Sequence, residues 1–414
     1  MQEKVLMKGN EAIAEAAILA GCRHYLGYPI TPQNEIPETM SLRLPECGGQ
    51  FVQAESEVAA INMLLGAGAC GIPAMTSSSS CGISLMQEGI SYMAGSHIPA
   101  VIVNMERGGP GLGDIGPSQG DYFQAVKGGG HGDHRNLVLA PSTAQECYDM
   151  MFRAFALAFK YANPVMLLGD AIVAQIKEPV RRQPPADALS PEALAELAAP
   201  WRMEGYGKRG PGAKPRLLKS VYLAEGALAA RNRLLMEKYA AMQAEACAEC
   251  WNTDDAELVV VAFGSMARIA RSAIRKLREE GLKAGLFRPK TLYPFPADAL
   301  RALAPGRRFL VIEQNTGQMV EDVRLSLMGE NGLSINLYTV LFILFFGIGY
   351  GAYYATADMP IPMVADCSDY ETYRSGKYIP GIMGTLFSLV DKLVSSLSAT
   401  VVGIAVTFIG LNTL

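Results

Sequence analysis

The 414-residue sequence predicts an α/β protein built on a parallel β-sheet, followed by a C-terminal segment of a different kind. Short apolar runs alternate with segments of helical periodicity up to about residue 330, as in a sheet that helices cover on both faces. This length allows two or three domains with a substantial core. From Gly332 to Ala357 no residue is charged, so the composition changes sharply near residue 330.

The elements of the first half follow from these patterns. The expected strands are residues 25–28, 50–53, 72–76, 100–105, 138–139 and 164–168. The expected helices are residues 10–20, 55–69, 83–93 and 143–161, and one more helix after residue 31. Thr31 is predicted to be the N-cap of this last helix and Pro32 its first residue.

The second half contains a smaller α/β unit. Residues 179–200 are rich in Pro and Ala and are predicted to be a connector, and a long helix is expected from residue 221 to about 251. The unit that follows is predicted to contain strands at 257–263, 284–287 and 309–313 and a helix at 266–280.

Charge and cysteine usage exclude some classes of function. The formal net charge is −4 and no run of Lys or Arg occurs, so a nucleic-acid partner is not expected. Cys247 and Cys250 form the one closely spaced cysteine pair, predicted to lie on a helix, and one such pair cannot hold an iron–sulfur cluster alone. Free thiols in a reducing cytoplasm are therefore expected, and residues 1–329 are predicted to be cytoplasmic.

Four unusual segments are expected just beyond strand ends, where open α/β sheets bind ligands. They are residues 27–32, 53–57, 76–82 and 106–111. Helix capping or turn chemistry can explain each segment taken singly. Their order and spacing are more specific than any one of them.

In that order, these segments resemble the α-type subunit of 2-oxoacid:ferredoxin oxidoreductases, especially the branched-chain (2-oxoisovalerate, 3-methyl-2-oxobutanoate) type. The resemblance covers about residues 1–328. Its densest stretches are GYPITPQNEIPE, FVQAESEVAAINMLLGA, TSSSSCGISLMQEGISYM, NMERGGPGLGDIGPSQGDYFQAVKGGGHGD and PVMLLGD. It implies a thiamine-diphosphate-binding fold of the pyrimidine type over 1–180, a linker with a long helix over 181–256, and a shortened transketolase C-terminal-like domain over 257–329.

The resemblance also implies a reaction and the residues that serve it. The reaction is the oxidative decarboxylation of a 2-oxoacid, with coenzyme A as acyl acceptor and ferredoxin as electron acceptor. Thiamine diphosphate needs a carboxyl group beside its aminopyrimidine; Glu57 matches that position, with Glu55 as the alternative. Arg107 matches the arginine that binds the substrate carboxylate, and Thr31 matches a substrate-contacting threonine. The other implied cofactor-binding residues are Pro29, Ile30 and Ser78.

The resemblance also implies a class of substrate and a set of partner subunits. The segment GGPGLGDIGPSQGDYFQ favours a branched-chain 2-oxoacid, with 2-oxoglutarate and pyruvate as alternatives. Gly169-Asp170-Ala171 departs from the Gly-Asp-Gly of the usual diphosphate and Mg²⁺ motif, and no asparagine lies between Asn163 and Asn232. A β-type subunit is therefore expected to hold the diphosphate and Mg²⁺, while γ and ferredoxin-like δ subunits complete the complex and the partners carry the iron–sulfur clusters.

Two remaining features are expected to lie outside this chemistry. His131 and His134 lack a third ligand, so no metal site is predicted there. Leu337–Tyr354 and Leu393–Leu411 are each long and apolar enough to be predicted transmembrane helices.

The tail resembles a second family. From about residue 335 it is similar to glycoside–pentoside–hexuronide cation symporters through MVADCSDYETYRSGKYIPGIMGTLFSLVDKLVSSLSATVVG, in which Lys392 matches an intramembrane lysine. Two helices cannot enclose a sugar pathway. The alternative readings of residues 330–414 are therefore a symporter fragment in a chimeric chain, or a genuine fusion that gives membrane association through residues 335–411.

Overall fold

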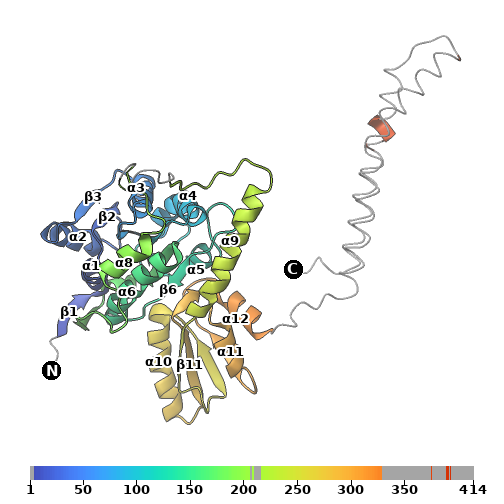
Figure 1. Cartoon of the computed structure of the whole chain (residues 1–414). Coiled ribbons are helices and arrows are strands. Elements are labelled where there is room, and N and C mark those ends of the chain that lie inside the picture. Colours follow the sequence, from blue (N-terminus) through green and yellow to red (C-terminus); the bar gives the residue numbers. More distant parts are fainter. Residues whose placement is uncertain are drawn as a thin grey trace. The chain divides into compact units, whose positions relative to one another are not determined.

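The computed structural model describes residues 4–205, 208, 216–328, 374, 388–390 and 392. The chain divides into two units, residues 1–329 and 330–414 (Figure 1). The first unit contains all the helices and strands discussed below. The predicted transmembrane stretches, Leu337–Tyr354 and Leu393–Leu411, lie outside the described residues. Among the residues that are described, no helix combines the length and hydropathy required to cross a membrane.

A seven-stranded sheet forms the centre of the first unit. Its strands, in spatial order, are β12 (Thr291–Tyr293), β6 (Leu137–Leu139), β7 (Pro164–Asp170), β5 (Ala100–Glu106), β4 (Ala74–Ser78), β2 (His24–Gly27) and β3 (Gln50–Gln53). All neighbours are parallel except β12, which pairs antiparallel with β6. After β2 the chain places β3 on one side and β4 on the other. The strand order therefore reverses at β2.

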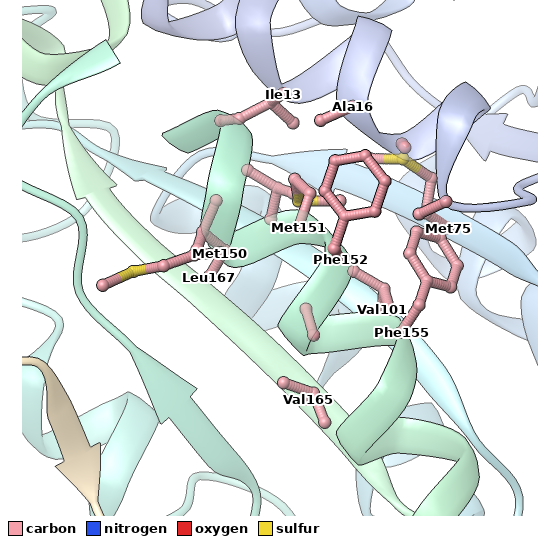
Figure 2. Packing of buried hydrophobic residues seen from close by; sticks show 14 of the residues in the cluster. Ile13, Ala16, Met75, Val101, Met150, Met151, Phe152, Phe155, Val165 and Leu167 are labelled. Atoms are coloured by element: carbon pink, nitrogen blue, oxygen red, sulfur yellow. The ribbon is translucent and has the colours of Figure 1, made fainter. Parts of the chain in front are cut away.

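Helices cover both faces of this central sheet. One face carries α1 (Gly9–Leu19), α2 (Glu35–Glu46) and α6 (Ala144–Tyr161), and the other carries α3 (Glu57–Ala69), α4 (Cys81–Ser96) and α5 (Tyr122–Val126). Figure 2 shows Phe152 and Phe155 of α6 near Ile13 of α1 and Val101 of β5. Both faces of β5 and β7 are buried, which explains why these strands are continuous apolar runs.

A second sheet follows in the chain. Its order is β13 (Arg308–Val311), β10 (Leu258–Val261), β11 (Ala284–Pro289) and β9 (Ala248–Trp251), and its helices are α10 (Gly264–Glu279), α11 (Ala297–Leu303) and α12 (Met319–Leu327). Val259 and Val261 share one buried cluster with α3 and α4, whereas Val260 packs on α10. β12 directly follows β11 but pairs with the central sheet. The two sheets are thus joined by a common core and by a strand.

Smaller elements complete the unit. β1 (Lys4–Lys8) pairs antiparallel with β8 (Lys177–Arg181), and the short helix α7 (Ala171–Gln175) follows β7. α8 (Pro191–Ala198) lies inside the segment predicted to be a connector, and α9 (Ala227–Met242) precedes the second sheet.

The structure corrects two local predictions. Thr31 and Pro32 do not begin a helix: α2 begins at Glu35 with Asn34 as its N-cap, because residues 28–33 form a turn that a buried glutamine holds from within. The long helix ends at Met242, so Cys250 lies on β9, where pairing with β11 satisfies its backbone. The cysteines of the described residues are free, and three of them, Cys47, Cys70 and Cys250, are exposed.

Candidate functional site

The candidate site lies at the carboxyl ends of β2, β4 and β5, where the strand order reverses. Parallel strands place the loops that follow them at one edge of the sheet, and ligands of doubly wound folds bind at such a reversal. The turn at residues 28–33, the start of α3, the serines after β4 and Arg107 after β5 all meet at this edge. The sequence had predicted these segments as strand ends.

Glu57 is the buried carboxylate of the site. Glu57 is the first residue of α3, whose N-cap Ser56 accepts a hydrogen bond from Ala59 N. Glu57 is only 5% exposed. Its Oε1 lies 3.5 Å from Ser78 Oγ at the end of β4. A Cβ on Gly82 would lie 2.5 Å from Glu57 Oε1, so a glycine is needed for α4 to approach this carboxylate. Glu55, the alternative from the sequence, is exposed.

Arg107 reaches across the site to the turn after β2. Its Nη1 donates to Thr31 O at 3.2 Å, and its Nη2 donates to Leu112 O at 2.9 Å and to Cys81 Sγ at 3.2 Å. Its Nε is buried and has no hydrogen-bond partner among the described residues. The predicted pair of Thr31 and Arg107 is therefore in contact, through the Thr31 carbonyl, and the guanidinium keeps a donor for an acceptor that a ligand would bring.

The turn at residues 28–33, which carries Pro29 and Ile30, is held in place by a buried side chain. Gln33 is fully buried; its Nε2 donates to Tyr28 O at 3.3 Å and its Oε1 accepts from Ser77 Oγ. Pro29 is exposed and Ile30 is half-buried, so they lie on the open side of this turn. Gln33 could not be predicted from the sequence, because its partner Ser77 belongs to a strand 44 residues away.

Ser80 connects the start of α4 to the end of β5. Its φ of 35° is a conformation that non-glycine residues rarely adopt. Its N donates to Asn104 Oδ1 at 2.9 Å, and its Oγ accepts from Arg107 N at 3.0 Å. Bonds to Asn104 of β5 and to Arg107 just after this strand hold the strained backbone. Sequence reasoning did not single out Ser80 or Asn104, although the run of four serines was a signal.

Glu106, at the end of β5, lies near two other carboxyl groups, Asp121 and Asp170. Glu106, Asp121 and Asp170 are mostly removed from water, and burial raises the pKa of each. The pKa of Glu106 is well above its ordinary value because of burial and because of the neighbouring charge of Asp121. Its Oε1 accepts from Asp121 N at 2.8 Å, while its Oε2 has no partner among the described residues. Burial therefore favours the protonated, neutral form of Glu106 in the folded protein.

This protonation predicts how Glu106→Gln changes stability with pH. Because the pKa of Glu106 is raised on folding, the folded protein holds this proton more tightly than an unfolded chain does, so a pH rising above the ordinary pKa of 4.5 favours unfolding of the wild type. The loss approaches about 1.4 kcal/mol per pH unit in that window. An amide is neutral throughout, so the variant should gain stability over the wild type as the pH rises from 5 to 8. Urea unfolding at both pH values measures the difference, and parallel pH dependences would contradict the assignment.

Asp170 connects β7 to two helices of the framework. It caps α7 through bonds from Ile172 N and Val173 N, and it accepts a hydrogen bond from Ser265 Oγ at the start of α10. Within the described residues no group of three or more Asp, Glu, His or Cys side chains could hold a metal ion. His134 is buried and His131 is exposed, so the histidine segment does not converge.

Two protein-family models match the chain. Residues 15–217 match the model described as "Pyruvate flavodoxin/ferredoxin oxidoreductase, thiamine diP-bdg". Residues 256–341 match "Pyruvate:ferredoxin oxidoreductase core domain II". This second match continues beyond residue 329, where the sequence placed the end of the second domain. The predicted similarity of the tail to sugar:cation symporters finds no support in the comparisons.

Curated relatives agree with these matches. The ketoisovalerate oxidoreductase subunit VorB of Methanothermobacter thermautotrophicus is 49% identical over 323 residues, which cover 78% of this chain and 89% of the relative. The 2-oxoglutarate synthase subunit KorA of Methanocaldococcus jannaschii is 37% identical, with coverage of 77% and 90%.

A solved structure shares the fold. It is the 2-oxoglutarate:ferredoxin oxidoreductase from Magnetococcus marinus with 2-oxoglutarate, coenzyme A and succinyl-CoA bound. The similarity has a TM-score of 0.69 and 28% sequence identity, and it covers 78% of this chain and 60% of that chain.

Proposed function

The chain belongs to the 2-oxoacid:ferredoxin oxidoreductases, as a subunit of the VorB and KorA type, and we propose that the site at the ends of β2, β4 and β5 is its contribution to their active site. These enzymes work as multi-subunit complexes with ferredoxin, and they depend on thiamine diphosphate, coenzyme A and iron–sulfur clusters. The proposal concerns which residues of this chain take part, which substrate they select, and what the partner subunits must add.

Glu57 is proposed to hold the aminopyrimidine of thiamine diphosphate. The supporting observation is a carboxylate that is 5% exposed, at a strand-order reversal, with Gly82 leaving no side chain in front of it. Thiamine diphosphate supplies, when bound, the electron sink that decarboxylation of a 2-oxoacid requires. The part of Glu57 is to share a proton with a ring nitrogen and so to set the protonation of the pyrimidine. Pro29, Ile30 and Ser78 are proposed to line the ring.

Arg107 is proposed to bind the carboxylate of the 2-oxoacid, beside Thr31. The buried Nε–H without a partner carries this proposal, because a guanidinium held by three protein acceptors and still lacking one is prepared for an anionic ligand. Thr31 Oγ1 already accepts a hydrogen bond from Asn34 Nδ2 at 3.3 Å. That bond leaves the hydroxyl hydrogen of Thr31 available for the substrate.

A branched-chain 2-oxoacid is the proposed substrate. The identity to the VorB relative, 49%, exceeds the 37% identity to the KorA relative. The glycine-rich loop (residues 108–116) also presents two apolar side chains, Leu112 and Ile115, which are 76% and 65% exposed. Such side chains suit an alkyl group better than a second carboxylate. 2-Oxoglutarate and pyruvate are the competing substrates for the test below.

The partner subunits are proposed to complete the site. Asp170 is engaged with α7 and Ser265, so Gly169-Asp170-Ala171 offers no free carboxylate for Mg²⁺. A β-type subunit would therefore hold the diphosphate and Mg²⁺, with γ and ferredoxin-like δ subunits in the same complex. The assembled complex should reduce ferredoxin with a branched-chain 2-oxoacid and coenzyme A, and faster than with 2-oxoglutarate or pyruvate. Activity of this chain without partners would refute the shared site.

Arg107→Ala tests the carboxylate contact. In the assembled complex this change should raise the KM for the 2-oxoacid and lower kcat/KM by about one to three kcal/mol of transition-state stabilisation, the range for a hydrogen-bonded charge. Steady-state ferredoxin reduction at varied 2-oxoacid concentration measures it, and the KM for coenzyme A provides the internal control. An unchanged kcat/KM would mean that the carboxylate binds elsewhere.

A further inference from the structure

The glycine-rich loop that adjoins Arg107 has little packing of its own. Residues 109–115 are exposed, and the loop is closed mainly by its own backbone: Gly108 N donates to Gly116 O at 3.1 Å, and Asp114 N donates to Gly108 O at 3.0 Å. Arg107 itself pairs with Pro117 in an isolated antiparallel bridge, and its Nη2 binds the Leu112 carbonyl. The place of the guanidinium therefore depends on where the segment after the loop is fixed.

That anchor segment (residues 117–123) is fixed by the second sheet and its loops. Gln119 is fully buried and makes four hydrogen bonds there. Its N donates to Gln314 O at 2.9 Å, its Oε1 accepts from Gln314 N at 3.1 Å, its Nε2 donates to Phe263 O at 3.0 Å, and its O accepts from Asn315 Nδ2 at 2.8 Å. The side chain of Gln119 thus joins the segments that follow β10 and β13 to the glycine-rich loop beside Arg107.

Three further residues of the anchor segment, Gly120, Tyr122 and Phe123, are held in the same way. Gln318 accepts from Phe123 N at 2.7 Å through its Oε1 and donates to Gly120 O at 2.8 Å through its Nε2. Tyr122 Oη donates to Asp322 at 2.7 Å. These contacts come from the segment before α12 and from α12 itself. The second sheet therefore contacts the substrate loop through its base, without contributing a side chain to the site.

We propose that Gln119 is a positioning residue for 2-oxoacid binding: it transmits the position of the second sheet to Arg107 through Pro117 and the glycine-rich loop. Among the described residues, the loop tip is held mainly by the backbone of the loop and by Arg107 itself, so loss of the side-chain bonds of Gln119 lets the loop move with the guanidinium away from the substrate carboxylate. A displaced binding group weakens binding of the substrate more than it changes chemistry once the substrate is bound. This inference rests on the proposed role of Arg107.

Gln119→Met, in the complete complex with its partner subunits, is the first test. Methionine keeps the length of the side chain and removes both polar atoms. The KM for the 2-oxoacid should rise about tenfold, as for a partly lost charged contact, while kcat stays within about twofold and the KM for coenzyme A is unchanged. Hydrogen exchange should also become faster at Gly108, Asp114 and Gly116, whose amides report loop closure.

Arg268→Met is the matched control. Arg268 of α10 also ties the second α/β unit to other elements, through Glu178 Oε1 of β8 at 2.7 Å and Ser142 O after β6 at 3.3 Å, and these two bonds do not involve the anchor segment. Arg268→Met should leave the KM for the 2-oxoacid and the hydrogen exchange of the loop amides unchanged from the wild type. If both variants raise this KM alike, the effect is a general loosening of the fold and the inference is wrong.

Gln318→Met serves if Gln119→Met does not assemble, because it frees the same segment from the other side. It should raise the same KM with the same split from kcat. A well-folded complex of either variant with an unchanged KM for the 2-oxoacid overturns the inference. Arg107→Ala, measured in parallel, separates the two proposals. If Arg107→Ala also leaves the KM for the 2-oxoacid unchanged, the proposed role of Arg107 is wrong. If Arg107→Ala raises this KM and the glutamine variants do not, only the proposed role of Gln119 is wrong.

Discussion

Glu57→Gln should abolish 2-oxoacid-dependent ferredoxin reduction in the assembled complex. The amide has the shape of the carboxyl group and fits beside Ser78 and Gly82, so the fold should be unaffected. It cannot take up or release a proton, and loss of such a group typically costs about 10²–10⁴-fold in rate. Single-turnover reduction of ferredoxin measures the loss, and thermal unfolding confirms that the variant remains folded.

Glu55→Gln decides between the two carboxylates that the sequence offered. Glu55 is exposed, two residues before Glu57, and its change removes the same charge from the same segment. If Glu57 is the pyrimidine partner, Glu55→Gln should retain most of the activity. If instead Glu55→Gln is inactive and Glu57→Gln turns over like the wild type, the assignment must be exchanged.

Arg288→Met should destabilise the first unit by about 3 kcal/mol, the low end of the cost of breaking a buried ion pair, because Glu146 keeps Lys290 at 3.0 Å. Arg288 is 3% exposed and lies on β11 of the second sheet. It donates to both oxygens of Glu146 on α6, at 2.6 and 2.8 Å, and to Glu249 Oε2 at 2.8 Å. One arginine thus ties the second sheet to a helix of the central sheet. Urea unfolding at pH 7 measures the effect.

The control and the pH dependence follow from the same network. Lys283 and Glu257 form an exposed pair at 3.5 Å, so Lys283→Met should change stability by less than about 1 kcal/mol.

Burial alone would raise the pKa of Glu146, but the bonds and charge of Arg288, with Lys290 and Ser142, outweigh it and lower that pKa to about 2. Because the folded pKa is depressed, this stabilisation is present above the ordinary pKa of 4.5 and is lost as the pH falls toward 2. The variant should lose less stability than the wild type over that range; equal losses would refute the assignment.

The positions of the catalytic candidates could be predicted from the sequence because they depend on local order along the chain. Glu57 and Arg107 each follow a strand that apolar patterning identifies, and parallel strands bring such ends to one edge. The serine run and the glycine-rich loop were recognisable for the same reason. Local signals were less reliable where a distant contact competes: Thr31 and Pro32 have the residue types of a helix start, yet Gln33 and Ser77 hold them in a turn.

Elements with distant partners could not be predicted. β12 was missed because three residues carry little periodicity, and its pairing with β6 joins segments about 150 residues apart. The strand at Cys250 was predicted to be helical because its pairing with β11 is not visible in the local sequence.

The sequence by itself determined the fold class, the family and the order of the residues around the site, since hydrophobic periodicity and motif spacing are properties of neighbouring residues. Only the tertiary structure decided which of Glu55 and Glu57 is buried, that Arg107 keeps an unpaired donor, and that Gln119 ties its loop to the second sheet. Burial and hydrogen bonding between residues 144 positions apart, such as Gln119 and Phe263, arise only when the sheets pack together, so no local pattern carries them.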